Sequence, residues 1–576
     1  MSNNILKGPD FKCANSANDL NQTINKYLLK RIDINDGRIC MFSFYDVALV
    51  DTQENRIQAL IISREHRRLA ADSLSIQFLI DAVTKKSLKI SEIMEQSRYL
   101  AIQLQLLGCE YDTVVGILLE NRLEYITIFL GILFAGAIAT FFNPLYTTVE
   151  LKHTLGISRP SIVFCSSNNY QKVQEINDKI ECIKHIILLD TEYRNPESKL
   201  IFSNLIHPSN KVLKTFEQQT SNDTALIFYS SGTTGLPKGV MWSHRNLIYF
   251  SKLANDEDVI GFYGKYTVGT LPMFHGFGMF LNISSILSDM TLIIMKKFDE
   301  KLFLTAIQEY KIKVLITVPP IIKFLLKDEI VQNFNVSSIE EIICGGAPLN
   351  SEIEDEIQRK FNLKYMRQTY GMTEICFTLI FKRNTYKKSG SCGSLIYGVQ
   401  AKVVDTKTGR ILPVKESGEI CIKGPGVMKG YYNNIEETKN IFDKDGWLHT
   451  GDIGYFDEDG DFFIIDRLKD LIKYKGFQVA PAELEGLLLE HDCVYDVAVI
   501  GKSDIEAGEI PMAFVVKKPG SKVTETDLIK YINGLVSPQK KLRGGVKFID
   551  KIPKNPSGKI LKKKLHEFYI NTNAKY

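Results

Sequence analysis

Short, nearly continuous apolar runs recur along the first 350 residues and alternate with segments of helical spacing. We expect strands at 114–119, 161–166, 186–190, 224–229, 291–295, 313–318 and 341–346. A strand that is apolar on both faces is buried on both faces, and strands that alternate with helices are typical of parallel sheets covered by helices. The pattern therefore predicts an α/β fold with covered, mostly parallel sheets.

Beyond residue 466 the pattern changes to that of a small α+β unit. Pro481 opens a helix, because proline suits the first helical turn and acidic residues follow near the positive end. The later segments predict strands at 493–500, 512–517 and 546–550 and a helix at 525–535. We therefore divide the chain into a large N-terminal domain, 1–466, and a small C-terminal domain, 467–576.

The stretch YITIFLGILFAGAIATFF at 125–142 carries no charge over eighteen residues, which is close to the length that crosses a bilayer. Gly136 breaks it and Asn143-Pro144 ends it, so we expect a buried helix at 124–135 and a buried strand at 137–142. No second such stretch and no flanking cluster of Lys and Arg supports insertion. The sequence predicts no transmembrane span.

The composition is that of a folded globular protein. Of 576 residues, 44% are hydrophobic and 24% are charged, so a large core can form and global disorder is excluded. The 71 Lys and Arg residues are nearly balanced by 67 Asp and Glu residues, and a net charge of +4 is too small to coat a phosphate backbone. We expect no nucleic-acid partner.

The 10 cysteines are scattered singly, without the spacing of a metal site, which favours a reducing compartment. The N-terminus, MSNNILKGPDFKC, lacks secretory and transit features, and the C-terminus, NAKY, is not the S-K-L peroxisomal address. We expect a cytoplasmic protein, with a peroxisomal location as the alternative. Polar residues at 64–68 interrupt an expected early strand, so 40–76 is a candidate insertion.

The sharpest local signal is a glycine- and hydroxyl-rich loop after an apolar strand, YSSGTTGLPKGV at 229–240. Glycines let backbone N–H groups approach an anion, hydroxyls add donors, and a lysine supplies charge. The loop is not a Walker A motif, because Gly239 follows Lys238 and VMWSH continues as an extended segment. We interpret it as a polyphosphate cradle, with a flexible surface hairpin as the alternative. Its candidate ligands are Ser230, Ser231, Gly232, Thr233, Thr234, Gly235 and Lys238.

Further motifs follow this loop along the chain. They are LPMFHGFGMF at 271–280, GGAP at 345–348, QTYGMTE at 368–374, GWLHTGD at 446–452, DRLKDLIKYKGFQVAPAELE at 466–485 and PKNPSGKI at 553–560. In this order they resemble the motifs of the adenylate-forming superfamily of acyl-CoA synthetases, 4-coumarate–CoA ligases and beetle luciferases. The chain is most similar to the luciferase-like acyl-CoA synthetases of insects, which implies an acyl-CoA synthetase-like fold with a mobile C-terminal domain.

The resemblance implies an ATP-dependent, AMP-forming acid–thiol ligase. A carboxylate attacks the α-phosphate of ATP to give an acyl-AMP and pyrophosphate, and CoA then gives an acyl-CoA and AMP. The expected cofactors are ATP, Mg²⁺ and CoA, and the expected partner is a small-molecule carboxylic acid. A monomer is sufficient for this chemistry.

The same resemblance assigns nucleotide-binding roles to the large domain. Glu374 would hold Mg²⁺, Asp452 would accept the two ribose hydroxyls, and Thr373 would be catalytic. The implied AMP-binding residues are Gly345, Gly346, Ala347, Gln368, Tyr370, Gly371, Thr373, Asp452 and Arg467. Taken singly, these residues have ordinary alternatives: a solvated glutamate, a core tyrosine, a simple turn, and a surface ion pair of Arg467 with Asp466 or Asp470.

Two further residues have implied catalytic roles. His275 would gate the acyl site, although its apolar neighbours also suit a satisfied core histidine. Lys559 matches the family's catalytic lysine, which bridges the carboxylate and the α-phosphate. A lysine-rich tail is also typical of a solvated face or a nucleic-acid patch, but this one lacks interleaved aromatic residues.

The resemblance also implies rotation of the C-terminal domain about Lys469. One arrangement would bring Lys559 to ATP for adenylation. The other would bring Lys473 to AMP, and Lys475 and Gly476 to CoA, for thioester formation.

The acyl-pocket candidates are Phe277, Leu281, Phe377 and Ile380, all apolar, so a medium- or long-chain fatty acid is the preferred substrate. An aromatic acid, a luciferase reaction and a non-catalytic relative are the alternatives. Beetle luciferases carry small hydroxyl residues where this chain has Leu281 and Phe377, and 246–270 lacks the arginine that lines their luciferin site. This disfavours light emission.

Overall fold

The computed structural model describes residues 6–7, 77–190, 200–214, 216, 219–231, 237–254, 259–260, 263–287, 290–381, 388–475, 477–555 and 558–573. The candidate insertion at 40–76 and loop residues 232–236 lie outside the described residues.

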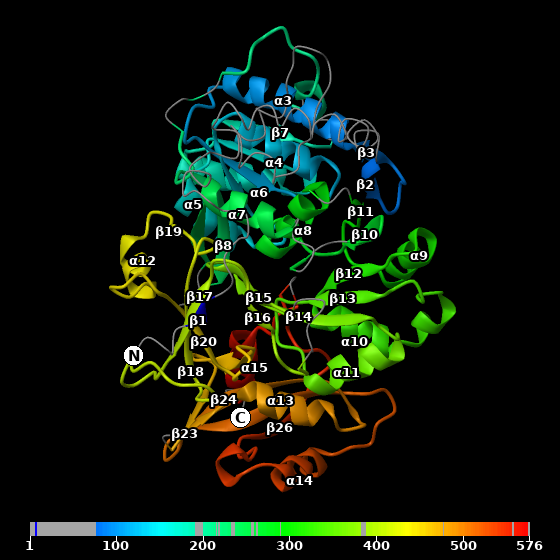
Figure 1. The fold of residues 1–576 in the computed structure, drawn as a ribbon, viewed down its shortest axis with the longest axis vertical. Coiled ribbons are helices and arrows are strands. Elements are labelled where there is room, and N and C mark those ends of the chain that lie inside the picture. The colour runs from blue at the N-terminus through cyan, green and yellow to red at the C-terminus, as the bar shows by residue number, and fades with distance from the viewer. Residues whose placement is uncertain are drawn as a thin grey trace.

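A seven-stranded sheet forms the upper part of the molecule (Figure 1), with strand order β19-β9-β8-β5-β4-β6-β7. Strands β4 to β8 run parallel, and β9 pairs antiparallel with β8. The strands are β4 (Val114–Leu118), β5 (Ile138–Phe141), β6 (Ile162–Cys165), β7 (His185–Leu188), β8 (Thr224–Ser231), β9 (Pro237–Ser243) and β19 (Gly430–Tyr431). The helices around it are α3 (Ile90–Leu106), α4 (Glu124–Phe134), α5 (Thr148–Ser158), α6 (Ser167–Ile180) and α7 (His244–Ala254). The strands expected in this region are confirmed.

Two further sheets are largely parallel. One has the order β10-β11-β2-β3 and the other β12-β13-β14-β15-β16, with β3, β15 and β16 antiparallel to their neighbours. Their strands are β2 (Gln77–Asp81), β3 (Ser87–Lys89), β10 (Tyr266–Gly269), β11 (Thr291–Ile294), β12 (Val314–Thr317), β13 (Glu341–Cys344), β14 (Tyr365–Met372), β15 (Cys376–Ile380) and β16 (Ser394–Leu395). Their helices are α8 (Gly276–Leu287), α9 (Glu300–Tyr310), α10 (Pro319–Lys327) and α11 (Ser351–Lys360).

A five-stranded antiparallel sheet, which the sequence did not predict, completes the large domain. Its order is β1-β17-β18-β20-β21. The strands are β1 (Leu6–Lys7), β17 (Gln400–Val404), β18 (Gly418–Lys423), β20 (Leu448–Phe456) and β21 (Phe462–Arg467), and α12 (Ile435–Ile441) lies between β19 and β20 in the chain. Strand β20 alternates buried and half-exposed residues over much of its length, and Glu419 interrupts β18, so neither has the continuous apolar run that marked the parallel strands.

The C-terminal domain has its own sheet, β23-β22-β25-β24 with β26 on β25, and its own apolar cluster. Its elements are β22 (Ile472–Tyr474), β23 (Phe477–Val479), α13 (Pro481–Leu489), β24 (Val494–Asp504), β25 (Gly508–Lys517), α14 (Glu525–Leu535), β26 (Gly545–Phe548) and α15 (Lys562–Asn573). This matches the predicted α+β unit. It lies at the lower end of the view, below β18 and β20 (Figure 1).

The apolar stretch at 125–142 is internal. Helix α4 is buried from Tyr125 to Phe134 and strand β5 along its whole length, and Gly136 between them has φ +80°. Over the described ranges, no helix is both long and apolar enough to span a bilayer. The expectation of a buried helix followed by a buried strand is confirmed.

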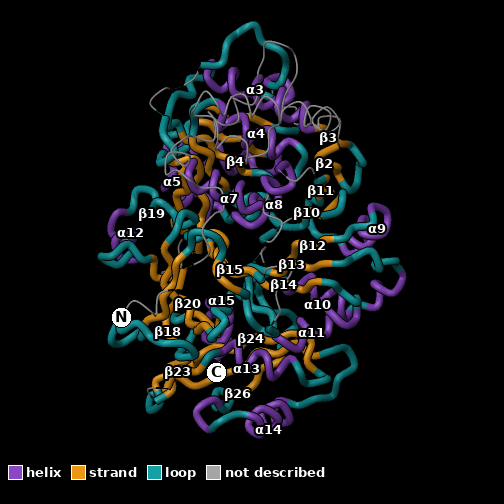
Figure 2. Tube along the Cα trace, viewed as in Figure 1, coloured by secondary structure: helices purple, strands orange, loops and turns teal. Residues whose placement is uncertain are grey.

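Strand ends from several sheets meet near the centre of the molecule, where Figure 2 shows β13, β14 and β15 between the upper sheets and the C-terminal domain. The chain leaves β13 at Cys344, and the QTYGMTE motif occupies the end of β14 and the turn after it. In parallel sheets, ligands bind beyond the carboxyl ends of the strands. The motifs found in the sequence therefore lie where the fold places a binding site.

Candidate active site

Asp452 is a buried carboxylate that joins three segments. It lies on β20, directly opposite Arg467 on β21, and is 4% exposed. Arg467 Nε lies 3.1 Å from one of its oxygens, and the Tyr370 hydroxyl donates to the other at 2.7 Å. Burial, and then the charge of Asp452, raise the pKa of Tyr370, so the phenol stays protonated and can donate.

The ion pair of Arg467 differs from the alternative that the sequence left open. Its carboxylate partner is Asp452. Asp466 instead accepts the backbone N–H of Arg467 at 2.7 Å and that of Ala482, at the start of α13, at 2.9 Å. Asp466 therefore links the domain junction to the first helix of the C-terminal domain. The Arg467 guanidinium pairs instead with Asp452, one of the nucleotide-binding candidates.

Glu374 is also buried, at 5% exposure, which does not fit a solvated loop glutamate. Its Oε1 accepts hydrogen bonds from the Ser230 hydroxyl at 2.7 Å and the Tyr431 hydroxyl at 3.0 Å. A carboxylate that accepts hydrogen bonds from two neutral donors can also ligate a cation, and Mg²⁺ is commonly bound by one carboxylate together with substrate phosphates. The site fits the ion that the resemblance implies.

Lys238 lies close to this carboxylate but has its own partners. Its ammonium pairs with Glu437 of α12 and lies 5.1 Å from the centroid of the Tyr431 ring. Strands β8 and β9 pair up to Ser230–Lys238 and Ser231–Pro237. The two ends of the glycine-rich loop are therefore placed at Glu374, although Gly232, Thr233, Thr234 and Gly235 lie outside the described residues.

The GGAP segment follows β13 with very little space around its backbone. A Cβ on Gly345 would lie 2.7 Å from a Thr369 methyl carbon, and Gly346 has φ +83°, so both positions require glycine. Gln368 anchors the residue that follows this segment, because its amide donates to the Leu349 carbonyl at 3.1 Å and to Glu354 at 2.9 Å. Ala347 is carried in the same turn.

The QTYGMTE motif forms a tight hairpin. A Cβ on Gly371 would lie 1.8 Å from the Cys376 carbonyl oxygen, at a β-bulge between β14 and β15. The Thr373 carbonyl accepts the indole N–H of Trp242 at 2.8 Å. These contacts fix the turn that carries Thr373 and Glu374.

His275 lies at the start of α8 and is half-buried. The backbone N–H of Phe277 donates to its Nδ1 at 3.3 Å, so the ring hydrogen of the neutral form is on Nε2. Burial, and then the charge of Lys559, lower its pKa to about 4. At neutral pH the ring is therefore an uncharged hydrogen-bond donor that lies within electrostatic range of Lys559.

Lys559 is held in a defined turn. Its backbone N–H donates to Asn555 Oδ1 at 2.8 Å, and Gly558 before it has φ +83°. A Cβ on Gly558 would lie 2.7 Å from Pro320 of α10, so this turn packs directly on the large domain. Burial, then the charges of Arg467 and Lys469, lower the pKa of Lys559 to about 8. The lysine belongs to the site and not to a solvated face.

The lysines assigned to the second arrangement lie elsewhere. Lys473 is exposed on β22, where its backbone N–H donates to Glu509 at 2.8 Å, and Lys475 is exposed with φ +45°. Gly476 lies outside the described residues. Lys469 lies between the two groups, and burial followed by the charge of Arg467 lowers its pKa. The structure thus brings Lys559 to the site and leaves Lys473 and Lys475 in solvent.

The four acyl-pocket candidates divide into two kinds. Phe277 and Phe377 are half-buried, whereas Leu281 and Ile380 are each 1% exposed. Phe377 packs on Phe280 with ring centroids 5.5 Å apart. The two phenylalanines therefore keep some exposed apolar surface, and the other two belong to the hydrophobic core.

Two site residues were not singled out from the sequence. Tyr431 lies outside the quoted motifs and contacts Glu374 across 57 positions of the chain, whereas Asn555 lies within the PKNPSGKI motif and contacts Lys559, 4 positions further on. The Asn555–Lys559 contact has the spacing of a local turn, which offered a weak signal. The Tyr431 contact depends on tertiary structure alone.

Comparison with known proteins identifies the family. The model of the AMP-binding enzyme family matches residues 69–432, and that of the AMP-binding enzyme C-terminal domain matches residues 483–559. The chain belongs to the AMP-binding enzyme family, whose members form adenylates. This agrees with the fold and with the buried cluster around Asp452 and Lys559.

The relatives include both kinds of enzyme that the motifs resembled. The chain is 40% identical over 506 residues to a luciferin 4-monooxygenase of Nipponoluciola cruciata, covering 86% of this chain and 92% of that protein. It is 40% identical over 496 residues to 4-coumarate–CoA ligase 2 of Nicotiana tabacum, covering 84% and 90%. Identity alone does not separate the two activities.

Among solved structures, ATP-bound MatB from Rhodopseudomonas palustris superposes with a TM-score of 0.78 at 28% identity. The match covers 88% of this chain and 98% of that one. It extends over both domains, so the two-domain, acyl-CoA synthetase-like fold is confirmed.

Proposed function

We propose that this protein is an ATP-dependent acid–thiol ligase that converts a carboxylic acid to its acyl-AMP and then to its acyl-CoA. The observation that carries the proposal is the position of Lys559. A lysine of the C-terminal domain is held within a buried cluster that also contains Arg467, Asp452 and a neutral His275.

In the first half-reaction a carboxylate oxygen bonds to the α-phosphorus of ATP, and the bond from that phosphorus to the pyrophosphate oxygen breaks. Lys559 and Arg467 supply positive charge where both reactants are negative, and preorganised charges of this kind stabilise the transition state. Asp452 binds the ribose hydroxyls, and His275 Nε2–H donates to the carboxylate. Mg²⁺ at Glu374 would neutralise phosphate charge.

In the second half-reaction the thiol sulfur of CoA bonds to the acyl carbon, the thiol proton is lost, and AMP leaves. We propose that the C-terminal domain rotates about Lys469 beforehand, which withdraws Lys559 and brings Lys473, Lys475 and Gly476 to the site. The exposed position of Lys473 and Lys475 supports this, because neither side chain is committed to a structural contact that rotation would break.

A medium- or long-chain fatty acid is the proposed substrate. Phe277 and Phe377 present apolar ring surface, and the supporting residues Leu281 and Ile380 carry no polar group that would anchor a second polar function on the acid. A linear chain can follow such a surface. A bicyclic luciferin needs the space that Phe377 occupies against Phe280.

The test is pyrophosphate release from ATP and Mg²⁺ with a panel of acids that includes dodecanoate and 4-coumarate, followed by acyl-CoA formation when CoA is added. We expect release with dodecanoate and a loss of roughly 10²–10³-fold in Lys559→Ala, the effect of removing one preorganised charge. Absence of release with every acid would contradict the proposal. Bright emission with luciferin, ATP and Mg²⁺ would favour the luciferase alternative.

A further inference from the structure

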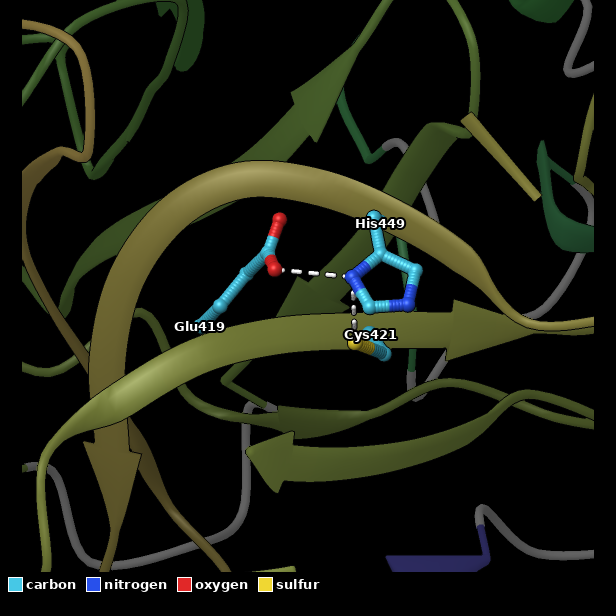
Figure 3. Close-up of side chains that lie close together, drawn as sticks. All are labelled: Glu419, Cys421 and His449. Carbon is cyan, nitrogen blue, oxygen red and sulfur yellow. Dashed lines mark hydrogen bonds and ion pairs between the residues drawn. The ribbon is translucent and has the colours of Figure 1, made fainter. Parts of the chain in front are cut away.

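A cluster of three metal-ligating side chains lies outside the residues assigned to ATP and CoA. Glu419 and Cys421 are two positions apart on β18. The register of the ladder with β20 shifts between them, and both side chains contact the His449 ring. His449 on β20 pairs directly opposite Cys421. The register of one antiparallel ladder therefore brings together residues that are 28 positions apart, and Figure 3 shows the three side chains converging. Sequence spacing alone gave no sign of this.

We propose that Glu419, Cys421 and His449 form a binding site for a divalent transition-metal ion, with Zn²⁺ as the ion whose chemistry fits best. His449 Nδ1 lies 2.7 Å from Glu419 Oε2 and 3.5 Å from Cys421 Sγ, and the three ligand atoms are all within 4.8 Å of one another. Zinc bonds of about 2.0–2.3 Å to nitrogen, oxygen and sulfur place the ligands of one ion on the order of 3–4 Å apart. Small side-chain rotations are enough.

The donor set selects the kind of ion. Thiolate and imidazole favour zinc and its neighbours over Mg²⁺, which prefers oxygen ligands such as Glu374. Three protein ligands leave the fourth tetrahedral position for water. Cys421 is buried and the Glu419 side chain is 12% exposed, but the His449 side chain is 34% exposed, so an ion can enter from that side.

The neighbouring charges are compatible with an ion. Lys402 on β17 pairs with Cys421 across the ladder, but its ammonium bonds to Asp443 at 2.9 Å. The same Asp443 oxygen lies 4.0 Å from His449 Nε2, on the far side of the ring from the ligand nitrogen. At this distance the carboxylate attracts a positively charged site electrostatically but accepts no hydrogen bond from the ring.

The site has a direct connection to the candidate nucleotide site. The other oxygen of Glu419, Oε1, accepts the backbone N–H of Gly451 at 3.0 Å, and Asp452 follows immediately. An ion that holds Glu419 and His449 would therefore restrain the Thr450–Asp452 segment of β20, at its start through His449 and at Gly451 through Glu419. We infer that occupancy changes the affinity for ATP. This consequence rests on the proposed function, whereas binding of the ion does not.

The test is calorimetric titration of the chelator-treated, full-length protein with Zn²⁺, with Co²⁺ as a second probe because a cobalt–thiolate bond gives a charge-transfer absorption. We expect one site per chain, weakened roughly 10- to 100-fold or more in Cys421→Ser and in the nearly isosteric Glu419→Gln. The control is Cys493→Ser, which removes a half-buried cysteine from the C-terminal domain and should leave binding unchanged.

Absence of Zn²⁺ binding to the wild-type protein would overturn the proposal, as would binding that survives in both ligand variants or is lost in Cys493→Ser. Two ligand variants are used so that misfolding of one does not decide the result. Glu419→Gln keeps the shape of the native side chain, and Cys421→Ser changes a different ligand. ATP affinity is then measured with and without Zn²⁺. Zn²⁺ binding in a protein that forms no acyl-AMP would keep the site and reject the proposed ligase.

Discussion

In the proposed ligase, the protonation state of Lys559 controls the first half-reaction. It must be charged to stabilise the attack on phosphorus, yet burial and the nearby charges of Arg467 and Lys469 lower its pKa to about 8. A lysine with this pKa loses its charge within the working range of pH. We therefore expect bound ATP to keep Lys559 charged, because the phosphates place negative charge next to the ammonium and raise its pKa.

The first prediction is a pH dependence with a defined sign. At low ATP, kcat/KM for pyrophosphate release should be constant below pH 8 and fall as pH rises through about 8, because the ammonium of Lys559 deprotonates. Saturating ATP should move the fall to higher pH. The arginine in Lys559→Arg stays charged over this pH range. The variant should be less active than the wild type, but its activity should not fall as pH rises through about 8. An identical fall in Lys559→Arg would assign the titration to another group.

The lowered pKa of Lys559 also makes the stability of the folded protein depend on pH. The folded-state pKa of Lys559 is below its unfolded value, so the unfolded chain binds more protons between about pH 8 and 10.5. The contribution of Lys559 to stability therefore rises with pH across this window. Below it, the buried ammonium destabilises the nucleotide-free protein. We expect Lys559→Met to raise Tm at pH 7 and to lose this advantage at pH 10, as measured by thermal unfolding without ATP.

A third prediction concerns the phenol that holds Asp452. Tyr370→Phe removes the hydroxyl that donates to Asp452 Oδ2 at 2.7 Å and leaves a buried carboxylate oxygen without that donor. The cost is about 1–3 kcal/mol. KM for ATP should rise several-fold and Tm should fall. Tyr365→Phe, on the same strand β14 but half-buried, is the matched control. An equal effect in both variants would show that the site does not depend on this contact.

At the scale of elements, helix α10 of the large domain contacts the C-terminal domain. Pro320 in its first turn packs on Gly558, one residue before Lys559. One turn further, Lys323 Nζ lies 3.3 Å from Asp496 Oδ1 of β24, and Lys554 bonds to the other oxygen of Asp496 at 2.5 Å. In the proposed rotation these contacts would break when Lys559 leaves the site. They would therefore belong to the adenylation arrangement.

The fourth prediction follows from this helix. Lys323→Ala should slow acyl-AMP formation by about two- to tenfold, since a partly buried ion pair contributes on the order of 1 kcal/mol. Thioester formation from supplied acyl-AMP should not be slowed. The control is Lys327→Ala on the same helix, and Lys323→Arg should restore adenylation. Equal slowing of both half-reactions would mean that Lys323 supports the fold and not one arrangement.

The helices and strands show which parts of the fold could be predicted from the sequence patterns. Apolar runs such as 114–119 predicted their strands correctly, because a strand buried on both faces needs such a run. Strands β18 and β20 were missed, since half-exposed antiparallel strands alternate weakly and resemble loops. The motifs located Asp452, Glu374 and Lys559 by resemblance. Contacts that join distant segments, such as Tyr431 with Glu374, could not be predicted, because they depend on how separate sheets pack.

At the scale of the whole molecule, the two assigned lysines of the C-terminal domain have opposite surroundings. Lys559 lies in the buried site against the large domain, whereas Lys473 is exposed on the β22–β23 hairpin. Both cannot reach one nucleotide in a single arrangement. A rigid protein with this structure would complete the first half-reaction and stop, so the proposed ligase requires the C-terminal domain to move.

The last prediction is that the two half-reactions separate genetically. Lys559→Ala should reduce acyl-AMP formation by roughly 10²–10³-fold and leave thioester formation from supplied acyl-AMP largely intact, because its charge acts only in the first arrangement. Lys473→Ala should do the reverse. Its side chain is exposed here, so truncation should leave Tm unchanged, and any loss of thioester formation then reports the second arrangement. The measurements are pyrophosphate release and single-turnover acyl-CoA formation. Equal losses of both half-reactions in each variant would contradict rotation, because one fixed arrangement would then have to serve both steps.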